Sequence, residues 1–169
     1  PPVVTGLQVL VRDGGRPLAG KRVGIVTNHT GIDTQGRSIV DLLHGRKEFT
    51  VTALFSPEHG IRGVEDAHIA SSKDEKTGLP VHSLYGATKK PTAEMLADVD
   101  VLVFDIQDIG ARFYTYITTM ALCMEAAQAH GKAMVVLDRP NAIGGEAVEG
   151  PILEEKLRGG FASYHPIPT

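Results

Sequence analysis

The stretch Val101-Leu-Val-Phe-Asp-Ile-Gln-Asp-Ile-Gly-Ala-Arg-Phe-Tyr-Thr-Tyr116 decides the fold class of this chain. Its first half is an apolar run ending in Asp105, which is typical of a strand buried on both faces of a parallel sheet. In open α/β sheets ligands bind at the carboxyl ends of strands, so a functional site is predicted where this strand ends. The polar side chains that follow are two acids, an amide, a guanidinium and two phenols: Asp105, Gln107, Asp108, Arg112, Tyr114 and Tyr116. Helix capping and one ion pair are the structural alternative, and they account for some of these residues but not for all.

Similar apolar segments recur on both sides of this stretch. They predict strands over residues 21–27, 51–55, 81–84, 101–105 and 133–137. Helical patterns lie at residues 6–13, at 38–43, where Ser38-Ile-Val-Asp41 resembles a capping box, at 91–97 and at 114–130. This alternation predicts a Rossmann-like three-layer α/β domain with a mostly parallel five-stranded sheet that spans residues 1–169. The segment 61–80 has no clear periodicity and is predicted to be a functional or mobile loop.

Composition excludes several classes of protein. A length of 169 residues fits one domain, and 42% hydrophobic residues with 22% charged residues are typical of a globular protein. A net charge of -3 without a Lys/Arg cluster argues against nucleic-acid binding. No apolar run approaches the length of a membrane span. The single cysteine, Cys123, lies in a helical pattern and is predicted to be a small buried hydrophobe.

Polar side chains follow four of the five predicted strands, at the point where each strand ends. Because the carboxyl ends of parallel strands share one edge of a sheet, we expect these side chains to meet there. In chain order they are Asn28, His29, Glu58, His59, Arg62, Asp105, Gln107, Asp108, Arg112, Asp138, Arg139 and Asn141.

The sequence predicts neither a cofactor nor a metal ion. A dinucleotide site needs G-x-G-x-x-G after the first strand, where this chain has Thr27-Asn-His-Thr-Gly31. Gly15-Arg-Pro-Leu-Ala-Gly-Lys21 matches G-x-x-x-x-G-K, but it lacks the hydroxyl that binds magnesium and precedes a strand, so it is predicted to be a turn. His59, Asp66 and His68 fit the spacing of no standard zinc site.

Glycoside hydrolysis fits the residue types best. It requires a carboxylic acid that protonates the leaving oxygen, and usually a second carboxylate or another nucleophile. Glu58 is the strongest candidate for the acid, because Pro57 and Gly60 fix and expose a turn directly after a strand. An ordinary ion pair between Glu58 and Arg62 is the structural alternative. The second group stays open among Asp105, Asp108, Asp138, Glu65 and Glu149.

Five motifs, in the same order along the chain, together resemble those of a known protein family. They are Ser56-Pro-Glu-His-Gly-Ile-Arg-Gly63, the stretch 105–116, Asp138-Arg-Pro-Asn141, Glu149-Gly-Pro151 and Tyr164-His-Pro-Ile-Pro168. From about Gly6 to its last residue the chain resembles the bacterial exo-β-N-acetylmuramidase family, many members of which were long known only as a domain of unknown function. It departs at Ala142, where the family usually has proline, and this affects the geometry of one loop only.

The resemblance implies that this chain is the N-terminal domain of a two-domain protein, with the active site in the cleft to a C-terminal domain. Family enzymes release N-acetylmuramic acid from the non-reducing ends of peptidoglycan fragments, so a muramoglycan is the expected substrate. Whether the isolated chain is active stays open. Glu58 would be the catalytic carboxylate, in a pocket lined by His59, Arg62, Gln107, Asp108, Arg112 and Tyr114.

The substrate suggests further roles. We expect Arg62 or Arg112 to bind the lactyl carboxylate of muramic acid, because a guanidinium matches a carboxylate bidentately. Asn28, Asp105, Tyr116, Asp138, Arg139 and Asn141 are expected to complete the substrate site. The nucleophile stays unassigned, and the acetamido group of the substrate is one alternative to a second carboxylate.

Two rival functions and the location remain open at this point. A non-catalytic sugar- or peptidoglycan-binding domain would use the same crevice, and a nucleotide-cofactor enzyme is disfavoured by the missing glycines. The location of peptidoglycan and the absence of an initiator methionine favour export. No signal peptide is visible in the sequence, and a cytoplasmic location is the alternative.

Overall fold

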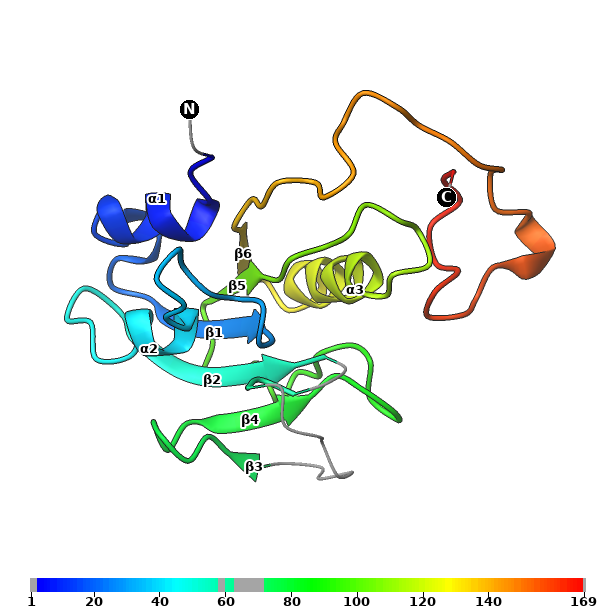
Figure 1. The fold of residues 1–169 in the computed structure, drawn as a ribbon. Helices are drawn as coiled ribbons and strands as arrows, with labels where there is room; N and C mark the ends of the chain where they lie inside the picture. Colours follow the sequence, from blue (N-terminus) through cyan, green and yellow to red (C-terminus); the bar gives the residue numbers. More distant parts are fainter. Residues whose placement is uncertain (1–2, 58–59, 63–71, 169) are drawn as a thin grey trace.

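The computed structural model describes residues 3–57, 60–62 and 72–168. This part of the chain forms a six-stranded sheet with the strand order β3-β4-β2-β1-β5-β6 (Figure 1). All neighbouring strands are parallel except β3, which is antiparallel to β4. The strands are β1 (Arg22–Thr27), β2 (Thr50–Ser56), β3 (Ser72–Lys73), β4 (Pro80–Ser83), β5 (Val101–Asp105) and β6 (Ala133–Val136).

The sheet corrects the predicted number of strands. The five predicted strands are present, but β3 adds a sixth at the edge of the sheet. It consists of two exposed polar residues, so it carries no apolar pattern that sequence reasoning can detect. The mostly parallel α/β architecture is confirmed.

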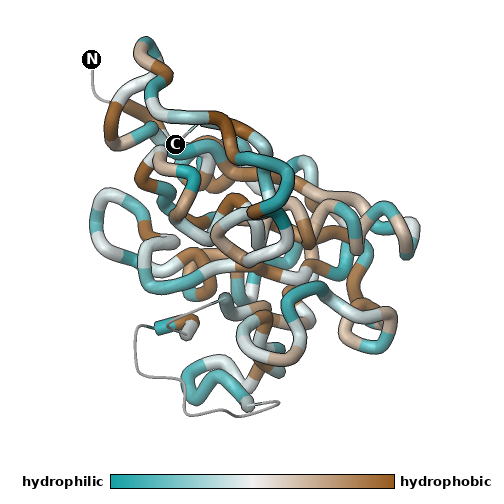
Figure 2. Tube along the Cα trace, turned by 90° about the vertical axis from the view of Figure 1, so that its right-hand side faces the viewer, coloured by the Kyte–Doolittle hydropathy of each residue, from teal (hydrophilic) through white to brown (hydrophobic). Residues whose placement is uncertain are grey.

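Alternating side chains of the central strands build two cores, one on each face of the sheet. Val101 and Val103 of β5 pack with α1 (Gly6–Arg12) and α2 (Ile39–Leu43). Leu102 and Phe104 pack on the opposite face with α3 (Tyr116–Ala129). Burial on both faces explains why β5 is apolar up to its last residue, Asp105, and it makes the domain three layers deep. Figure 2 shows hydrophobic stretches (brown) in the middle of the molecule.

The helical prediction for residues 91–97 is wrong. Leu96 donates its N–H to the carbonyl of Thr92, four residues earlier, at 3.1 Å. Ala97 and Val99 instead donate to the carbonyls three residues earlier, each at 3.2 Å. The segment therefore forms turns, and it still buries Leu96 and Val99 in the core on the α3 side. Short helices depend on tertiary packing, and here a series of turns buries both side chains without a continuous helix.

The remaining predicted helices are present. Thr5 and Gln8 form a reciprocal capping box at the start of α1, and Ser38 caps α2 by accepting from the Val40 N–H. Two single-turn 3₁₀ helices, Arg16–Leu18 and Glu155–Leu157, are added. No helix in the described ranges has the length and apolar character that crossing a membrane requires.

Cys123 behaves as predicted. Its side chain is fully buried in the core beneath α3. Burial raises the pKa of the thiol to about 12, so it stays protonated and unreactive at neutral pH.

Candidate functional site

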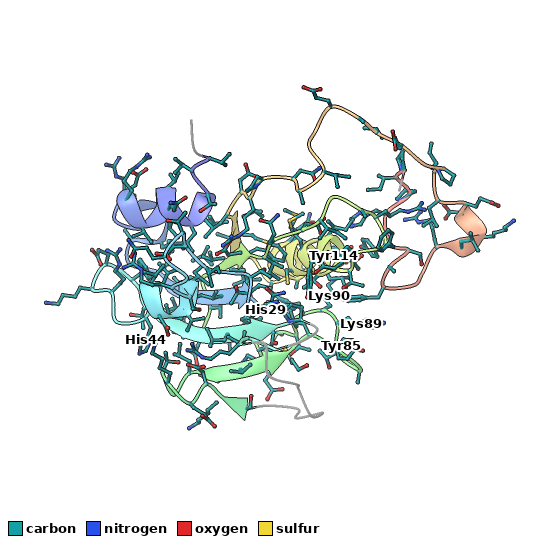
Figure 3. All side chains as sticks on the ribbon, viewed as in Figure 1. His29, His44, Tyr85, Lys89, Lys90 and Tyr114 are labelled. Carbon is teal, nitrogen blue, oxygen red and sulfur yellow. The ribbon has the colours of Figure 1, made fainter. Side chains whose placement is uncertain are left out.

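The carboxyl ends of the parallel strands form one edge of the domain, to the right in Figure 1. Thr27, the last residue of β1, is the register partner of Asp105, the last residue of β5. The chain passes from β1 to β2 in one direction along the sheet and from β5 to β6 in the other. The topological switch point, at which α/β folds bind ligands, therefore lies between β1 and β5 at this edge. Figure 3 shows His29 and Tyr114 at this end and His44 at the other.

Hydrogen bonds join the loops that follow β1 and β5. The Thr27 hydroxyl donates to the Asp105 carbonyl at 2.7 Å, and the Thr30 hydroxyl accepts from the Gln107 N–H at 3.0 Å. Thr30 also donates to Asn28 Oδ1 at 2.6 Å. Asn28 is only 1% exposed, and its Nδ2 has no hydrogen-bond partner in the described part of the chain. Sequence reasoning missed Thr30, although a hydroxyl directly after a buried strand was the available signal.

Asp105 and Arg139, both predicted to bind substrate, form a buried ion pair. Arg139 donates from Nε and Nη2 to the two carboxylate oxygens at 2.6 and 2.9 Å, and Nη2 also donates to the Ile32 carbonyl at 3.0 Å. Burial raises the pKa of the Asp105 carboxyl, and the Arg139 guanidinium opposes that rise. The pair ties the loops after β1 and β6 to the end of β5 and accounts for both side chains without a ligand.

Gln107 and Asn141 fasten the loops after β5 and β6 to each other. Gln107 Nε2 donates to the Pro140 carbonyl at 2.8 Å and to the Asp108 carbonyl at 2.7 Å. Asn141 packs against Gly110, which has a φ of 80° and no room for a Cβ because the Asn141 side chain fills the space. These contacts hold the two loops in a fixed relative position.

Asp108 lies where these loops meet. Its Oδ1 accepts from the Gly110 N–H at 2.7 Å, which closes a turn. Its Oδ2 is buried and has no hydrogen-bond partner among the described residues. A buried carboxylate oxygen without a donor is costly, so this atom is suited to receive one from a ligand or water.

Two adjoining cavities open at this edge. The inner cavity, of about 290 Å³, lies between α3 and the loops after β5 and β6. The outer cavity, of about 680 Å³, lies between the loop after β5 and the C-terminal segment 143–168. Four residues line both: Asp108, Gly110, Ile117 and Asn141.

Other predicted residues line these cavities. Asp138 and Tyr116 line the inner cavity, and Tyr116 stacks edge-on against Tyr114 with 4.9 Å between ring centroids. Arg112 lines the outer cavity, where its Nη1 donates to the Ile167 carbonyl at 2.9 Å. Glu149, an alternative second carboxylate in the sequence, also lines the outer cavity.

The C-terminal segment returns to α3 and forms one wall of the outer cavity. The Tyr164 hydroxyl donates to the Glu125 carboxylate, and His165 Nε2 lies 3.2 Å from the Ile117 carbonyl. Lys89 lies over the Phe161 ring, 5.1 Å from its centroid. The outer cavity is therefore formed by residues distant in sequence.

Arg62 is held by two carboxylates away from these cavities. Its Nε and Nη2 donate to Asp74 at 2.6 and 3.0 Å, and Nη2 donates to Asp41 at 3.2 Å. Asp41 also accepts from Lys76 at 2.6 Å, so it serves this network and the predicted capping box is replaced by a single Ser38 cap. The bidentate edge that a substrate carboxylate requires is occupied by Asp74.

This network predicts a loss of stability in acid. The Arg62 guanidinium, opposed by burial and aided by Thr77, lowers the pKa of Asp74 from 3.8 to about 2. The ionised form is favoured by folding, so its contribution is complete above a pH of about 4 and disappears as the pH falls to about 2. We expect Asp74→Asn to lower the free energy of unfolding at neutral pH by up to about 2 kcal/mol. Urea unfolding from pH 7 to 2 measures this, and parallel pH curves for the variant and wild type would contradict it.

Glu58 and His59 lie outside the described residues, as do Glu65, Asp66 and His68. Ser56 and Pro57, which precede Glu58, lie at the carboxyl end of β2, next to β1. The described residues contain no group of three His, Cys, Asp or Glu side chains arranged to hold a metal ion.

Fold and site together define a Rossmann-like α/β domain whose candidate site lies at the carboxyl edge of its sheet. The family model for the N-terminal part of the exo-β-N-acetylmuramidase NamZ matches residues 23–169. The chain belongs to this family, which confirms the resemblance drawn from its motifs.

Known relatives agree with this assignment. The peptidoglycan β-N-acetylmuramidase NamZ of Bacillus subtilis (strain 168) is 54% identical over an alignment 170 residues long, which covers 99% of this chain but 41% of that protein. A crystal structure of a DUF1343 family protein from Bacteroides fragilis NCTC 9343 superposes with a TM-score of 0.90 at 51% identity, and covers 97% of this chain and 41% of its own. A second such protein from the same organism gives a TM-score of 0.84 at 37% identity, over 99% of this chain and 43% of its own. The chain thus spans about two fifths of these relatives.

Proposed function

We propose that the protein is an exo-acting glycoside hydrolase that releases N-acetylmuramic acid from peptidoglycan fragments. The observation that carries the proposal is the pair of adjoining cavities at the carboxyl edge, with Asp108 between them and Arg112 in the outer one. Family membership and the name of the Bacillus subtilis relative support the same chemistry. The reaction needs no cofactor, in keeping with the missing dinucleotide motif.

Arg112 is our candidate ligand for the lactyl carboxylate. It lines the outer cavity, whereas Arg62 lines neither cavity and donates to Asp74 from Nε and Nη2. Arginine is suited to a carboxylate because its planar fork offers two parallel donors. The contact from Arg112 Nη1 to the Ile167 carbonyl keeps the side chain at the cavity wall.

Glu58 is our candidate for the general acid and base. It follows β2, which is the neighbour of β1 in the sheet, so the chain enters this segment at the same edge as the cavities. The substrate acetamido group or one of the remaining carboxylates would serve as nucleophile. Of the carboxylates considered, Asp105 is paired with Arg139, while Asp108 and Asp138 line the inner cavity.

The relatives are more than twice as long as this chain, which supports a second, C-terminal domain. We propose that this domain forms the other wall of a shared cleft over the carboxyl edge. The substrate would then lie between the two domains, and an exported protein would meet it in the cell wall.

The direct test is an assay of the full-length protein on a chromogenic β-N-acetylmuramide and on muramoglycan fragments. We expect release of the chromophore and of free N-acetylmuramic acid from non-reducing ends, with no cleavage of internal bonds. Mass spectrometry of the products distinguishes these outcomes. Binding of the fragments without any release would instead support the non-catalytic binding domain.

A further inference from the structure

We infer that the inner cavity receives the acetamido group of N-acetylmuramic acid and that Asp108 accepts its N–H, while the outer cavity receives the lactyl group. This inference deepens the proposed function and rests on it. The starting observation is the buried Asp108 Oδ2, which has no hydrogen-bond partner in the described ranges. It is a charged acceptor at the point where both cavities meet.

The chemistry of the inner cavity matches an acetamido group. Such a group has an N–H donor, a carbonyl acceptor and an apolar methyl. The cavity offers the Asp108 carboxylate as acceptor and an apolar wall made by Ile106, Ile117, Met120 and Val136. Asn141 Oδ1 already accepts from the Ile143 N–H at 3.2 Å, so its amide nitrogen is the part that can donate to a carbonyl.

The arrangement of the two cavities matches the arrangement of substituents on the sugar. In N-acetylmuramic acid the acetamido and lactyl groups are attached to neighbouring ring carbons. The cavities share four lining residues, so groups in both would be close together. Of the arginines among the described residues, Arg139 lines the inner cavity, where it is paired with Asp105, and Arg112 lines the outer cavity. The carboxylate-bearing substituent therefore belongs in the outer cavity.

The test compares two ligands that differ only in the N–H donor of the acetamido group. Calorimetry measures binding of N-acetylmuramic acid and of its analogue with an acetyl ester in place of the acetamide to the full-length protein. A hydrogen bond to a charged group contributes enough that wild type should prefer the amide roughly 10- to 100-fold. Asp108→Asn keeps Oδ1 as an acceptor for Gly110 and replaces Oδ2 by a donor, so this preference should disappear.

Asp33→Asn is the matched control. Asp33 Oδ1 closes a similar turn by accepting from the Gln35 N–H at 2.9 Å, but Oδ2 is paired with Arg37 and the residue lines neither cavity. This variant should keep the full preference for the amide. Thermal unfolding checks that both variants are folded. If Asp108→Asn does not fold, Met120→Phe is the substitute test: it narrows the inner cavity and should weaken binding of both ligands.

The outcomes separate this inference from the proposed function. Turnover of muramides together with an amide preference that survives Asp108→Asn would overturn the inference and leave the function standing. A preference that disappears in Asp108→Asn, in a protein without turnover, would support the binding site and reject the hydrolase. Equal wild-type affinity for the amide and the ester overturns the inference in either case.

Discussion

Glu58→Gln in the full-length protein is expected to slow the release of N-acetylmuramic acid by about 10²–10⁴-fold, the usual contribution of general acid–base catalysis. Glutamine keeps the shape of the side chain but cannot give a proton to the leaving oxygen. Steady-state kinetics on a chromogenic muramide measure the effect, which should fall on kcat rather than on KM.

The control for this variant is Glu155→Gln, which changes the same functional group on an exposed 3₁₀ turn, where the Glu155 side chain is 81% exposed. It should leave turnover unchanged. If Glu58→Gln retains turnover within about tenfold of wild type, Glu58 is not the general acid. Lost turnover with unchanged affinity for N-acetylmuramic acid would show that Glu58 acts in the reaction and not in binding.

Arg139→Met is expected to lower the free energy of unfolding by about 3–5 kcal/mol, because it leaves the Asp105 carboxylate buried without its partner. Asp105 is fully buried, and the Arg139 side chain is 9% exposed. Methionine preserves much of the apolar volume of the arginine stem, so loss of the charge partner dominates. Urea unfolding at neutral pH measures the change.

A double variant distinguishes pairing from packing. Asp105→Leu combined with Arg139→Met removes both charges and should recover most of the lost stability, since buried pairs exchange for apolar residues at little cost. Arg12→Met, which breaks an exposed pair with Asp13, should have a much smaller effect. An Arg139→Met variant as stable as the double variant would show that Asp105 has another partner.

The central fold was predictable because its strands are buried on both faces. β1, β2 and β5 are apolar along most of their length, and this pattern is visible without coordinates. The edge of the sheet was not predictable in the same way. β3 has no apolar residue, and its position depends on pairing with β4.

The location of the site could be predicted from the strand order, but the ion-pair partners of its side chains could not. A guanidinium after a strand looks the same in sequence whether it meets a ligand or a buried aspartate. Arg139 pairs with Asp105 across 34 positions of chain, and Arg62 with Asp74 across 12. These pairings arise from loop packing, which sequence spacing does not encode.

The outer cavity has a consequence for how a ligand and the protein stabilise each other. One wall comes from the loop after β5, and the other from residues 143–149 and 167–168 of the C-terminal segment. The side chains of Tyr164 and His165 attach this segment to α3. A molecule that contacts both walls gains affinity only when the segment is packed against α3. By linkage, its binding must therefore stabilise the packed arrangement of the segment to the same extent. Occupancy of the outer cavity and order of the C-terminal segment are therefore two measures of one equilibrium.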